Sequence, residues 1–166
     1  LRAAKPEDKM AVFAVLMRLR EICCDPRLVA DNWDGGSAKL DACMELVTAA
    51  VEGGHRILLF SQFTSMLELL AKRLDEAGVS HFTLQGSTPK PVRAELVRRF
   101  NGGEADVFLI SLRAGGTGLN LTAADIVIHY DPWWNVAAQN QATDRAYRIG
   151  QRSPVQVYKL IAQDTI

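Results

Sequence analysis

No GxxxxGKS or GxxxxGKT string occurs in this 166-residue sequence, so the chain lacks the loop that cradles a triphosphate in P-loop enzymes. It has few thiols and imidazoles, and none of its three cysteines forms a CxxC pair: Cys23, Cys24 and Cys43. This pattern indicates reduced, buried thiols in a cytosolic protein and argues against a zinc site. No apolar run approaches the roughly 18 residues that a membrane-spanning helix requires.

Net charge is also missing, because 19 basic residues balance 19 acidic ones. Bulk charge therefore gives no sign of nucleic acid, and any such contact must come from local patches. The hydrophobic fraction of 48% and the charged fraction of 23% are typical of a soluble globular protein. A chain of this length forms one domain and buries about two-thirds of its unfolded surface.

Strand-like and helix-like segments alternate along most of the chain. Five short apolar runs have the character of buried strands: 56–61, 81–84, 106–111, 125–130 and 155–161. This alternation predicts an α/β fold, a parallel sheet with helices on both faces. Residues 1–36 read as a helical lead-in followed by a polar loop, and residues 37–166 as the lobe itself. The sequence leaves open whether the lead-in packs on the sheet.

Several local signals locate the helices between these strands. We expect Ser37 to cap one helix, Ser65 and Glu68 to form a capping box at the next, and Ser87-Thr88 to begin a third. The lead-in helix carries an apolar stripe of Met10, Phe13, Leu16 and Met17. Apolar residues at helical spacing should face the core in the three later helices: Leu40, Met44, Val47 and Val51; Leu67, Leu70 and Leu74; and Val92, Leu96 and Phe100.

Polar residues follow the strand-like runs, where ligands meet an open parallel sheet. Gly86-Ser87-Thr88 leads directly into a helix, so its amides and hydroxyls are placed either to hold a phosphate or simply to cap the helix. Four nearby side chains add a local basic patch: Lys90, Arg93, Arg98 and Arg99. The sequence favours neither interpretation.

A helix is expected from about residue 136 to 148, since this stretch is rich in alanine and has no glycine or proline. Gln141, Arg145 and Arg148 are spaced i, i+4 and i+7 and share one face. Two arginines held in register stabilise the charge that spreads over a transferring phosphoryl group. Alternatively, the face is solvated and Asp144 pairs with Arg148.

Five strings of the sequence resemble, in order, the motifs of the Swi/Snf-type DNA-translocating ATPases, a branch of the superfamily-two helicases. RLREICCDPRLV is similar to the helical lead-in, LLFSQFTSML to motif IV, LQGSTPKPVRAELVRRFN to motif IVa, ISLRAGGTGLNLTAADIVIHYDPWWN to motif V with its extension, and QATDRAYRIGQ to motif VI. Three positions depart from the usual pattern, namely Gln85, Val136 and Tyr147.

The resemblance implies that the chain is the second of two RecA-like lobes. Residues facing double-stranded DNA would then be Ser61, Gln62, Gly86, Ser87, Thr88, Ser111, Arg113 and Trp134. Arg145 and Arg148 would act on ATP in a cleft also lined by Gly118, Asn120 and Gln141. The first lobe, absent from this sequence, would hold most of the ATP and its Mg²⁺.

From the same resemblance we expect a fragment of a larger protein, closest to bacterial members, that cannot hydrolyse ATP by itself. Such a protein would be cytoplasmic, on the bacterial nucleoid, or nuclear if eukaryotic, and would act without a membrane. A DNA-bound protein would be its remodelling target. Two alternatives remain, the second lobe of a DEAD-box-like RNA helicase and a non-catalytic lobe that binds DNA or protein.

Overall fold

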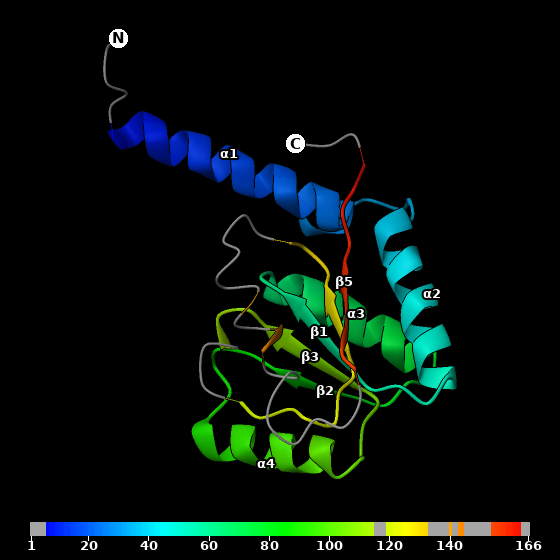
Figure 1. Ribbon diagram of the computed structural model, residues 1–166. Coiled ribbons are helices and arrows are strands. Elements are labelled where there is room, and N and C mark those ends of the chain that lie inside the picture. The colour runs from blue at the N-terminus through cyan, green and yellow to red at the C-terminus, as the bar shows by residue number, and fades with distance from the viewer. Residues whose placement is uncertain (1–5, 115–118, 133–139, 141–142, 145–153, 164–166) are drawn as a thin grey trace.

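Five parallel strands form one sheet in the computed structural model of this chain, which describes residues 6–114, 119–132, 140, 143–144 and 154–163. The strands are β1 (Ile57–Ser61), β2 (His81–Leu84), β3 (Val107–Ser111), β4 (Ile126–His129) and β5 (Gln156–Lys159), in the order β2-β3-β1-β4-β5 (Figure 1). Every strand predicted from the sequence is present, and the parallel sheet is confirmed.

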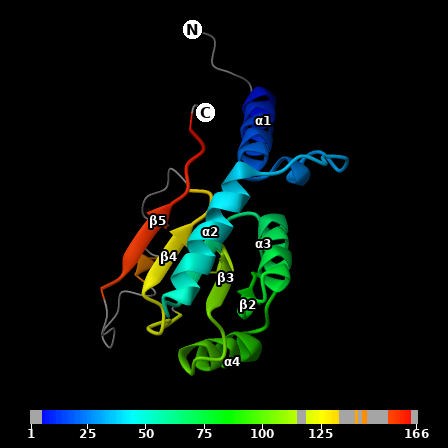
Figure 2. The ribbon, with the colours of Figure 1, turned by 90° about the vertical axis from the view of Figure 1, so that its right-hand side faces the viewer.

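Alternate residues of the strands point into two separate cores. Ile57 and Leu59 of β1 pack in one core, whereas Leu58 and Phe60 pack in the other. Helices α2 (Ala38–Glu52) and α3 (Thr64–Glu76) contribute to the first core, and α4 (Lys90–Asn101) to the second (Figure 2). Burial on both faces explains why β1 and β3 are apolar without interruption.

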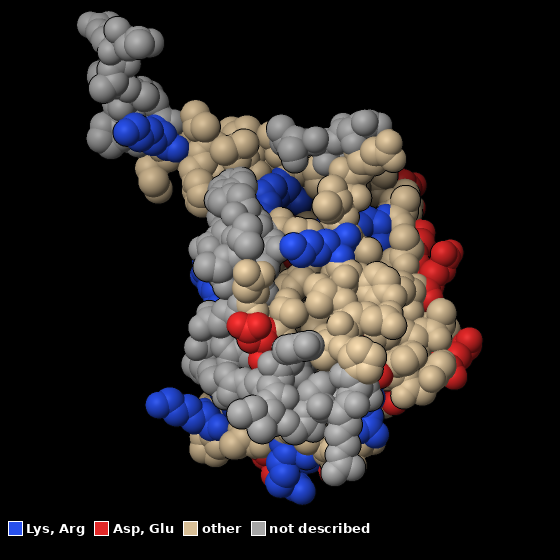
Figure 3. All heavy atoms as spheres, in the orientation of Figure 1, with Lys and Arg blue, Asp and Glu red and all other residues tan. Residues whose placement is uncertain are grey.

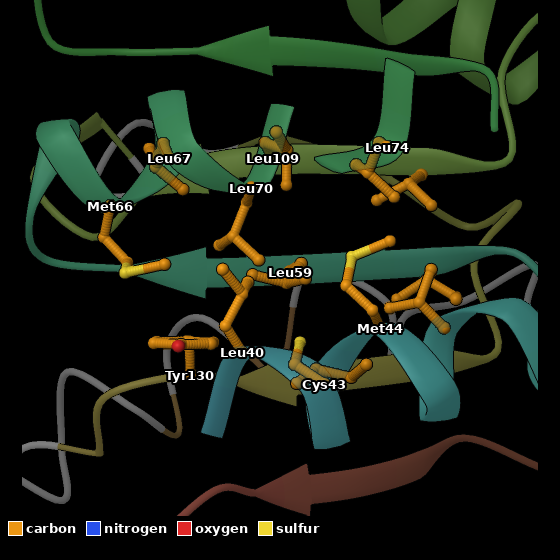
Figure 4. Packing of buried hydrophobic residues seen from close by; sticks show 14 of the residues in the cluster. Leu40, Cys43, Met44, Leu59, Met66, Leu67, Leu70, Leu74, Leu109 and Tyr130 are labelled. Atoms are coloured by element: carbon orange, nitrogen blue, oxygen red, sulfur yellow. The ribbon is translucent and has the colours of Figure 1, made fainter. Parts of the chain in front are cut away.

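The first core is a layer of aliphatic side chains between the sheet and two helices. Leu40 of α2 and Leu70 of α3 meet over Leu59 of β1, and all three are fully buried (Figure 4). Burying each of these leucines stabilises the fold by about 1.5–3 kcal/mol. The helical spacing of apolar residues predicted for α2 and α3 therefore describes their packing correctly.

Two of the three expected helix starts are wrong. Ser37 does cap α2 and accepts from Leu40 N at 3.3 Å. The predicted Ser65–Glu68 capping box is absent, because α3 already begins at Thr64 and Phe63, at its N-cap position, makes no side-chain cap. Ser87-Thr88 does not begin a helix either, since α4 starts at Lys90 after Pro89.

The stripe expected on α4 is only partly buried. Phe100 is fully buried and Leu96 packs against the second core, but Val92 is 46% exposed. Val92 lies in the first turn of α4, and the buried part of the stripe begins further along the helix. Spacing alone cannot show which turns of a helix pack against a core.

The C-terminal half of the lead-in helix α1 (Pro6–Cys24) packs on the lobe. Cys24 belongs to the first core, and its carbonyl accepts from Tyr130 Oη at 2.9 Å and from Ser37 Oγ at 3.4 Å. The other half extends away from the sheet (Figure 1), leaving Met10 and Phe13 exposed. The sequence left open whether this helix packs on the sheet, and Met17 does pack against the core. A domain boundary at residues 36–37 stays a prediction.

His129, the last residue of β4, is held inside the fold. It is 2% exposed, stacks on Phe60 with ring centroids 5.6 Å apart, and places Nε2 3.1 Å from Thr143 Oγ1. Burial lowers the pKa of His129 to about 4, and the charge of Lys159 acts in the same direction. The imidazole is therefore neutral at pH 7.

We expect the chain to lose stability on acidification through His129. Its folded pKa lies below the unfolded value of about 6.5, so its contribution is complete above pH 6.5 and is lost as the pH falls toward 4. Between pH 7.5 and 5 the loss should be about 2 kcal/mol. Denaturant titrations of the 166-residue chain and of its His129→Gln variant measure it, and an identical pH dependence in the two would contradict the assignment.

Candidate nucleic-acid interface

A hollow of about 580 Å³ lies where the carboxyl ends of three strands meet α1. Five of the side chains or backbone segments predicted to face DNA line it: Gln62, Gly86, Ser87, Ser111 and Arg113. They come from the end of β3 and from the loops after β1, β2 and β3, and α1 contributes Met17 and Glu21. The sheet therefore brings residues that are up to about fifty positions apart in the sequence to one place.

Two of the predicted DNA-facing residues support the hollow without lining it. Ser61 is fully buried, and its hydroxyl accepts from Phe63 N at 3.1 Å. The hydroxyl of Thr88 accepts from Gln85 N at 3.0 Å and so closes the turn before α4. In this arrangement both side chains shape the loops, and a direct DNA contact by the buried Ser61 hydroxyl is not available.

The loop after β2 is held by Arg93, which extends back from the first turns of α4. Its guanidinium donates to three carbonyls, those of Thr88 at 2.6 Å, Gly86 at 2.7 Å and Gln85 at 3.4 Å. Because these three carbonyls turn toward Arg93, the opposite side of the loop is left to contact a ligand. Arg93 was predicted as part of a basic patch, and the structure instead gives it this supporting role.

The rest of that basic patch is largely neutralised by neighbouring acids. Arg98 makes two hydrogen bonds to Glu95, at 2.9 and 2.7 Å, and Arg99 Nε donates to Glu104 at 2.7 Å. Figure 3 shows basic side chains at separate places on one face, some of them close together in its upper half, with acidic ones along the right-hand edge. We therefore take the hollow, and not the predicted basic patch, as the candidate interface.

Asp131, two residues after β4, is a buried carboxylate beside the hollow. It is 5% exposed and accepts from the Gln62 amide N–H at 3.1 and 3.3 Å. Burial raises the pKa of Asp131 to about 6, although hydrogen bonds from Ser61 and Gln62 and the charge of Arg20 act against that rise. Asp131 thus holds the backbone of the loop that lines the hollow.

Sequence reasoning missed Asp131 and Arg20 as parts of this site. Arg20 was not singled out within the lead-in helix, yet its Nη2 donates to Pro132 O at 3.3 Å. One signal was present for Asp131, because an acid immediately after a buried strand lies at the edge where ligands bind. No signal was present for Arg20, since its partners are more than forty residues away.

The residues assigned to an ATP cleft are placed apart from the hollow or lie outside the described residues. Asn120 is exposed, and its carbonyl accepts from Asn101 Nδ2 at 2.8 Å beside the end of α4. Those outside the described residues are Gly118, Gln141, Arg145 and Arg148, and Trp134 from the DNA-facing set. Within the described residues no group of three His, Cys, Asp or Glu side chains could hold a metal ion. No helix of the described part is long and apolar enough to cross a bilayer.

Sequence comparison relates the chain to known proteins. The model of the helicase conserved C-terminal domain matches residues 38–150. The putative ATP-dependent helicase/translocase YwqA of Bacillus subtilis is 43% identical over 96% of this chain and 18% of its own length. The SWI/SNF-related regulator of chromatin subfamily A member 1 of Mus musculus is 37% identical over 100% of this chain and 17% of its own length. The chain thus spans less than a fifth of these curated relatives.

Structural comparison gives the same relationship. The Sulfolobus solfataricus SWI2/SNF2 ATPase core, solved in complex with dsDNA, is 32% identical with a TM-score of 0.81, over 96% of this chain and 34% of that one. The C-terminal part of the Fun30 ATPase domain is 32% identical with a TM-score of 0.75, over 90% of this chain and 51% of that one. The predicted RecA-like arrangement is confirmed.

We expect Arg93→Ala to loosen the loop after β2 while the sheet persists. Removing a charged donor from three carbonyls should lower the free energy of unfolding by about 1–2 kcal/mol, less than for a fully buried donor. Hydrogen exchange should quicken at the amides of Gln85 and Thr88, whose bonds close the turn.

Arg98→Ala is the matched control, because Arg98 lies on the same helix but bonds only to the exposed Glu95 in the described part of the chain. It should leave exchange at Gln85 and Thr88 unchanged. Equal protection of these amides in wild type and Arg93→Ala would refute the supporting role of Arg93.

Proposed function

Because this chain belongs to the helicase C-terminal domain family, in its SWI2/SNF2 branch, we propose that it is the second motor lobe of an ATP-dependent translocase on double-stranded DNA. A first RecA-like lobe of the same polypeptide would bind most of the ATP. The present lobe would grip one strand of the duplex and complete the ATP cleft. The hollow at the carboxyl edge of the sheet carries the DNA half of this proposal.

The lining of the hollow has the chemistry that a phosphodiester requires. Phosphate oxygens only accept hydrogen bonds. The hollow offers three donors, the side-chain NH₂ group of Gln62, the Ser87 hydroxyl and the exposed Arg113 guanidinium. These donors come from the ends of three neighbouring strands, so their spacing is set by the sheet. A rigid row of donors suits a backbone of regular repeat and carries no information about base sequence.

One related structure supports the choice of nucleic acid in this proposal. A relative with the same fold was solved with dsDNA, which supports a duplex as partner over RNA or a single strand. The zero net charge of the chain agrees with contact limited to the hollow. We propose that the motor tracks along duplex DNA.

The ATP half of the proposal is carried by the family's motif VI. We propose that Arg145 and Arg148 reach the phosphates of ATP, with Gly118, Asn120 and Gln141 nearby. ATP bound there supplies the phosphoryl group, and the Mg²⁺ ligands would belong to the first lobe. What this lobe itself adds is fixed positive charge, which is most effective where negative charge develops during transfer.

Gly86→Ala in the complete enzyme tests the DNA contact. A Cβ at Gly86 would meet no heavy atom within 4 Å, and its φ is not positive, so alanine should fold without strain. If a phosphate approaches this backbone, the methyl group should raise the duplex concentration for half-maximal ATPase stimulation by about tenfold. ATPase titrations with duplex DNA, single-stranded DNA and RNA measure the effect, and duplex DNA should stimulate most.

Pro89→Ala is a suitable control, because Pro89 is exposed three residues on and does not line the hollow. Stronger stimulation by RNA than by duplex DNA would favour the RNA-helicase alternative. If no nucleic acid stimulates the ATPase activity, a non-catalytic lobe is favoured and the proposal is wrong.

Arg148→Ala in the complete enzyme tests the ATP contact. We expect DNA-stimulated hydrolysis to fall by about 10³–10⁵, with ATP and DNA binding largely retained, because the guanidinium meets charge that develops in the transition state. Arg148→Lys should restore little, since an ammonium lacks the planar fork that bridges two phosphate oxygens. Arg145→Ala should behave similarly.

Asp144→Ala serves as the comparison, since Asp144 is exposed and neighbours both arginines in sequence. Steady-state kinetics of the three alanine variants decide between the two interpretations of this helix. Near-normal turnover in Arg148→Ala would show a solvated arginine and would leave the ATP assignment without support.

A further inference from the structure

Arg20 of α1 holds the side chain of Gln62 at the mouth of the hollow. With the Gln62 amide oxygen turned toward it, that oxygen accepts from Arg20 Nη2 at 2.8 Å and from Nη1 at 2.6 Å. The opposite orientation would set the amide NH₂ against two N–H donors, so the guanidinium selects one orientation. The same guanidinium donates to Pro132 O at 3.3 Å and lies 5.9 Å from the Phe63 ring centroid.

The backbone of Gln62 is held independently by Asp131. The Gln62 N–H donates to both carboxylate oxygens, at 3.1 and 3.3 Å, so the main chain is fixed from β4. The side chain is fixed from α1 by Arg20. Asp131 and Arg20 also attract each other electrostatically, which keeps the two anchors together.

We propose that Arg20 is a positioning residue for nucleic-acid binding, which orients the Gln62 amide so that its NH₂ group is left to donate to a phosphate. This inference rests on the proposed function and deepens it. A phosphodiester oxygen accepts hydrogen bonds and cannot donate, so an amide free to rotate would present its oxygen to the phosphate part of the time. By occupying that oxygen, Arg20 makes Gln62 a donor toward a phosphate.

The contact also joins two parts of the chain with different tasks. Arg20 lies on the lead-in helix, whereas Gln62 follows β1 and Pro132 follows β4. A guanidinium with five N–H groups can serve several acceptors at once, which a lysine ammonium cannot do in a plane. The residue type at position 20 therefore matters as much as its charge.

The test is a double-mutant cycle in the complete enzyme, read as the duplex concentration for half-maximal ATPase stimulation. Arg20→Ala should raise this concentration about five- to tenfold, with the maximal rate at saturating DNA and the KM for ATP unchanged. In a Gln62→Ala background, Arg20→Ala should add no further increase. Lys9→Ala, on the exposed first half of α1, is the control and should have no effect.

Two further variants guard against simple loss of folding. Arg20→Lys keeps the positive charge but not the planar fork, so it should weaken DNA binding nearly as much as Arg20→Ala. Gln62→Glu keeps the size of the side chain and its pairing with Arg20 but has no NH₂ group. It should bind duplex DNA at least as weakly as Gln62→Ala.

The outcomes separate this inference from the proposed function. If Arg20→Ala weakens DNA binding equally in the wild-type and the Gln62→Ala backgrounds, Arg20 has a general structural role and the inference is overturned. So would DNA binding in Gln62→Glu that equals wild type. Unchanged DNA dependence in Gln62→Ala, beside a loss in Gly86→Ala or Arg113→Ala, would overturn the inference alone. Unchanged DNA dependence in all three would overturn the proposed function too.

Discussion

Three consecutive residues at the carboxyl end of β4 hold together the parts of this lobe that its function would need. His129 lies against Thr143, in the segment that leads to the two arginines. Tyr130 donates to the carbonyl of Cys24 at the end of α1. Asp131 accepts from the backbone of Gln62 beside the hollow. Side-chain alternation at the end of β4 explains why His129 and Tyr130 reach different layers, because neighbouring side chains point to opposite faces, whereas Asp131 lies beyond the strand.

The cost of this arrangement is burial of an ionisable group at each end of the three. Burial lowers the pKa of His129 to about 4 and raises that of Asp131 to about 6. Each environment disfavours the charged form of the group, and hydrogen bonds offset part of that penalty. For Asp131 the hydrogen-bond partners are Ser61 and the Gln62 backbone, beside the hollow. These hydrogen bonds stabilise the carboxylate and so limit the rise in pKa that burial causes.

Much of the fold could be predicted from the sequence, because its strongest signals are local. Uninterrupted apolar runs predicted β1 and β3 correctly, and the spacing of leucines predicted the buried face of α3. Helix starts were less reliable, since Ser65 and Thr88 have the residue types of caps but are used otherwise. Ser37 is a true cap because it also bonds to the end of α1. Whether a residue caps a helix depends on where the chain enters that helix, and packing against neighbouring elements determines this position.

The candidate site could be predicted only where its residues belong to a motif. Gln62, Gly86, Ser87, Ser111 and Arg113 were expected at strand ends, and the sheet does bring them to one hollow. Arg93 was expected to offer its charge outward, yet three carbonyls of the loop take it up. Arg20 was not expected at all. Both arginines act on residues that would touch the ligand, and sequence patterns carry little trace of such indirect roles.

This difference has a physical basis that extends beyond single residues. A residue that touches a phosphate must present a donor in a set place, so its type and spacing are restricted along the chain. A residue that positions another is restricted only by where the fold brings the two together. Arg20 and Gln62 are 42 positions apart and meet because α1 ends against the carboxyl edge of β1 and β4. The end of the lead-in helix is therefore part of the candidate interface, even though its first half extends away from the lobe.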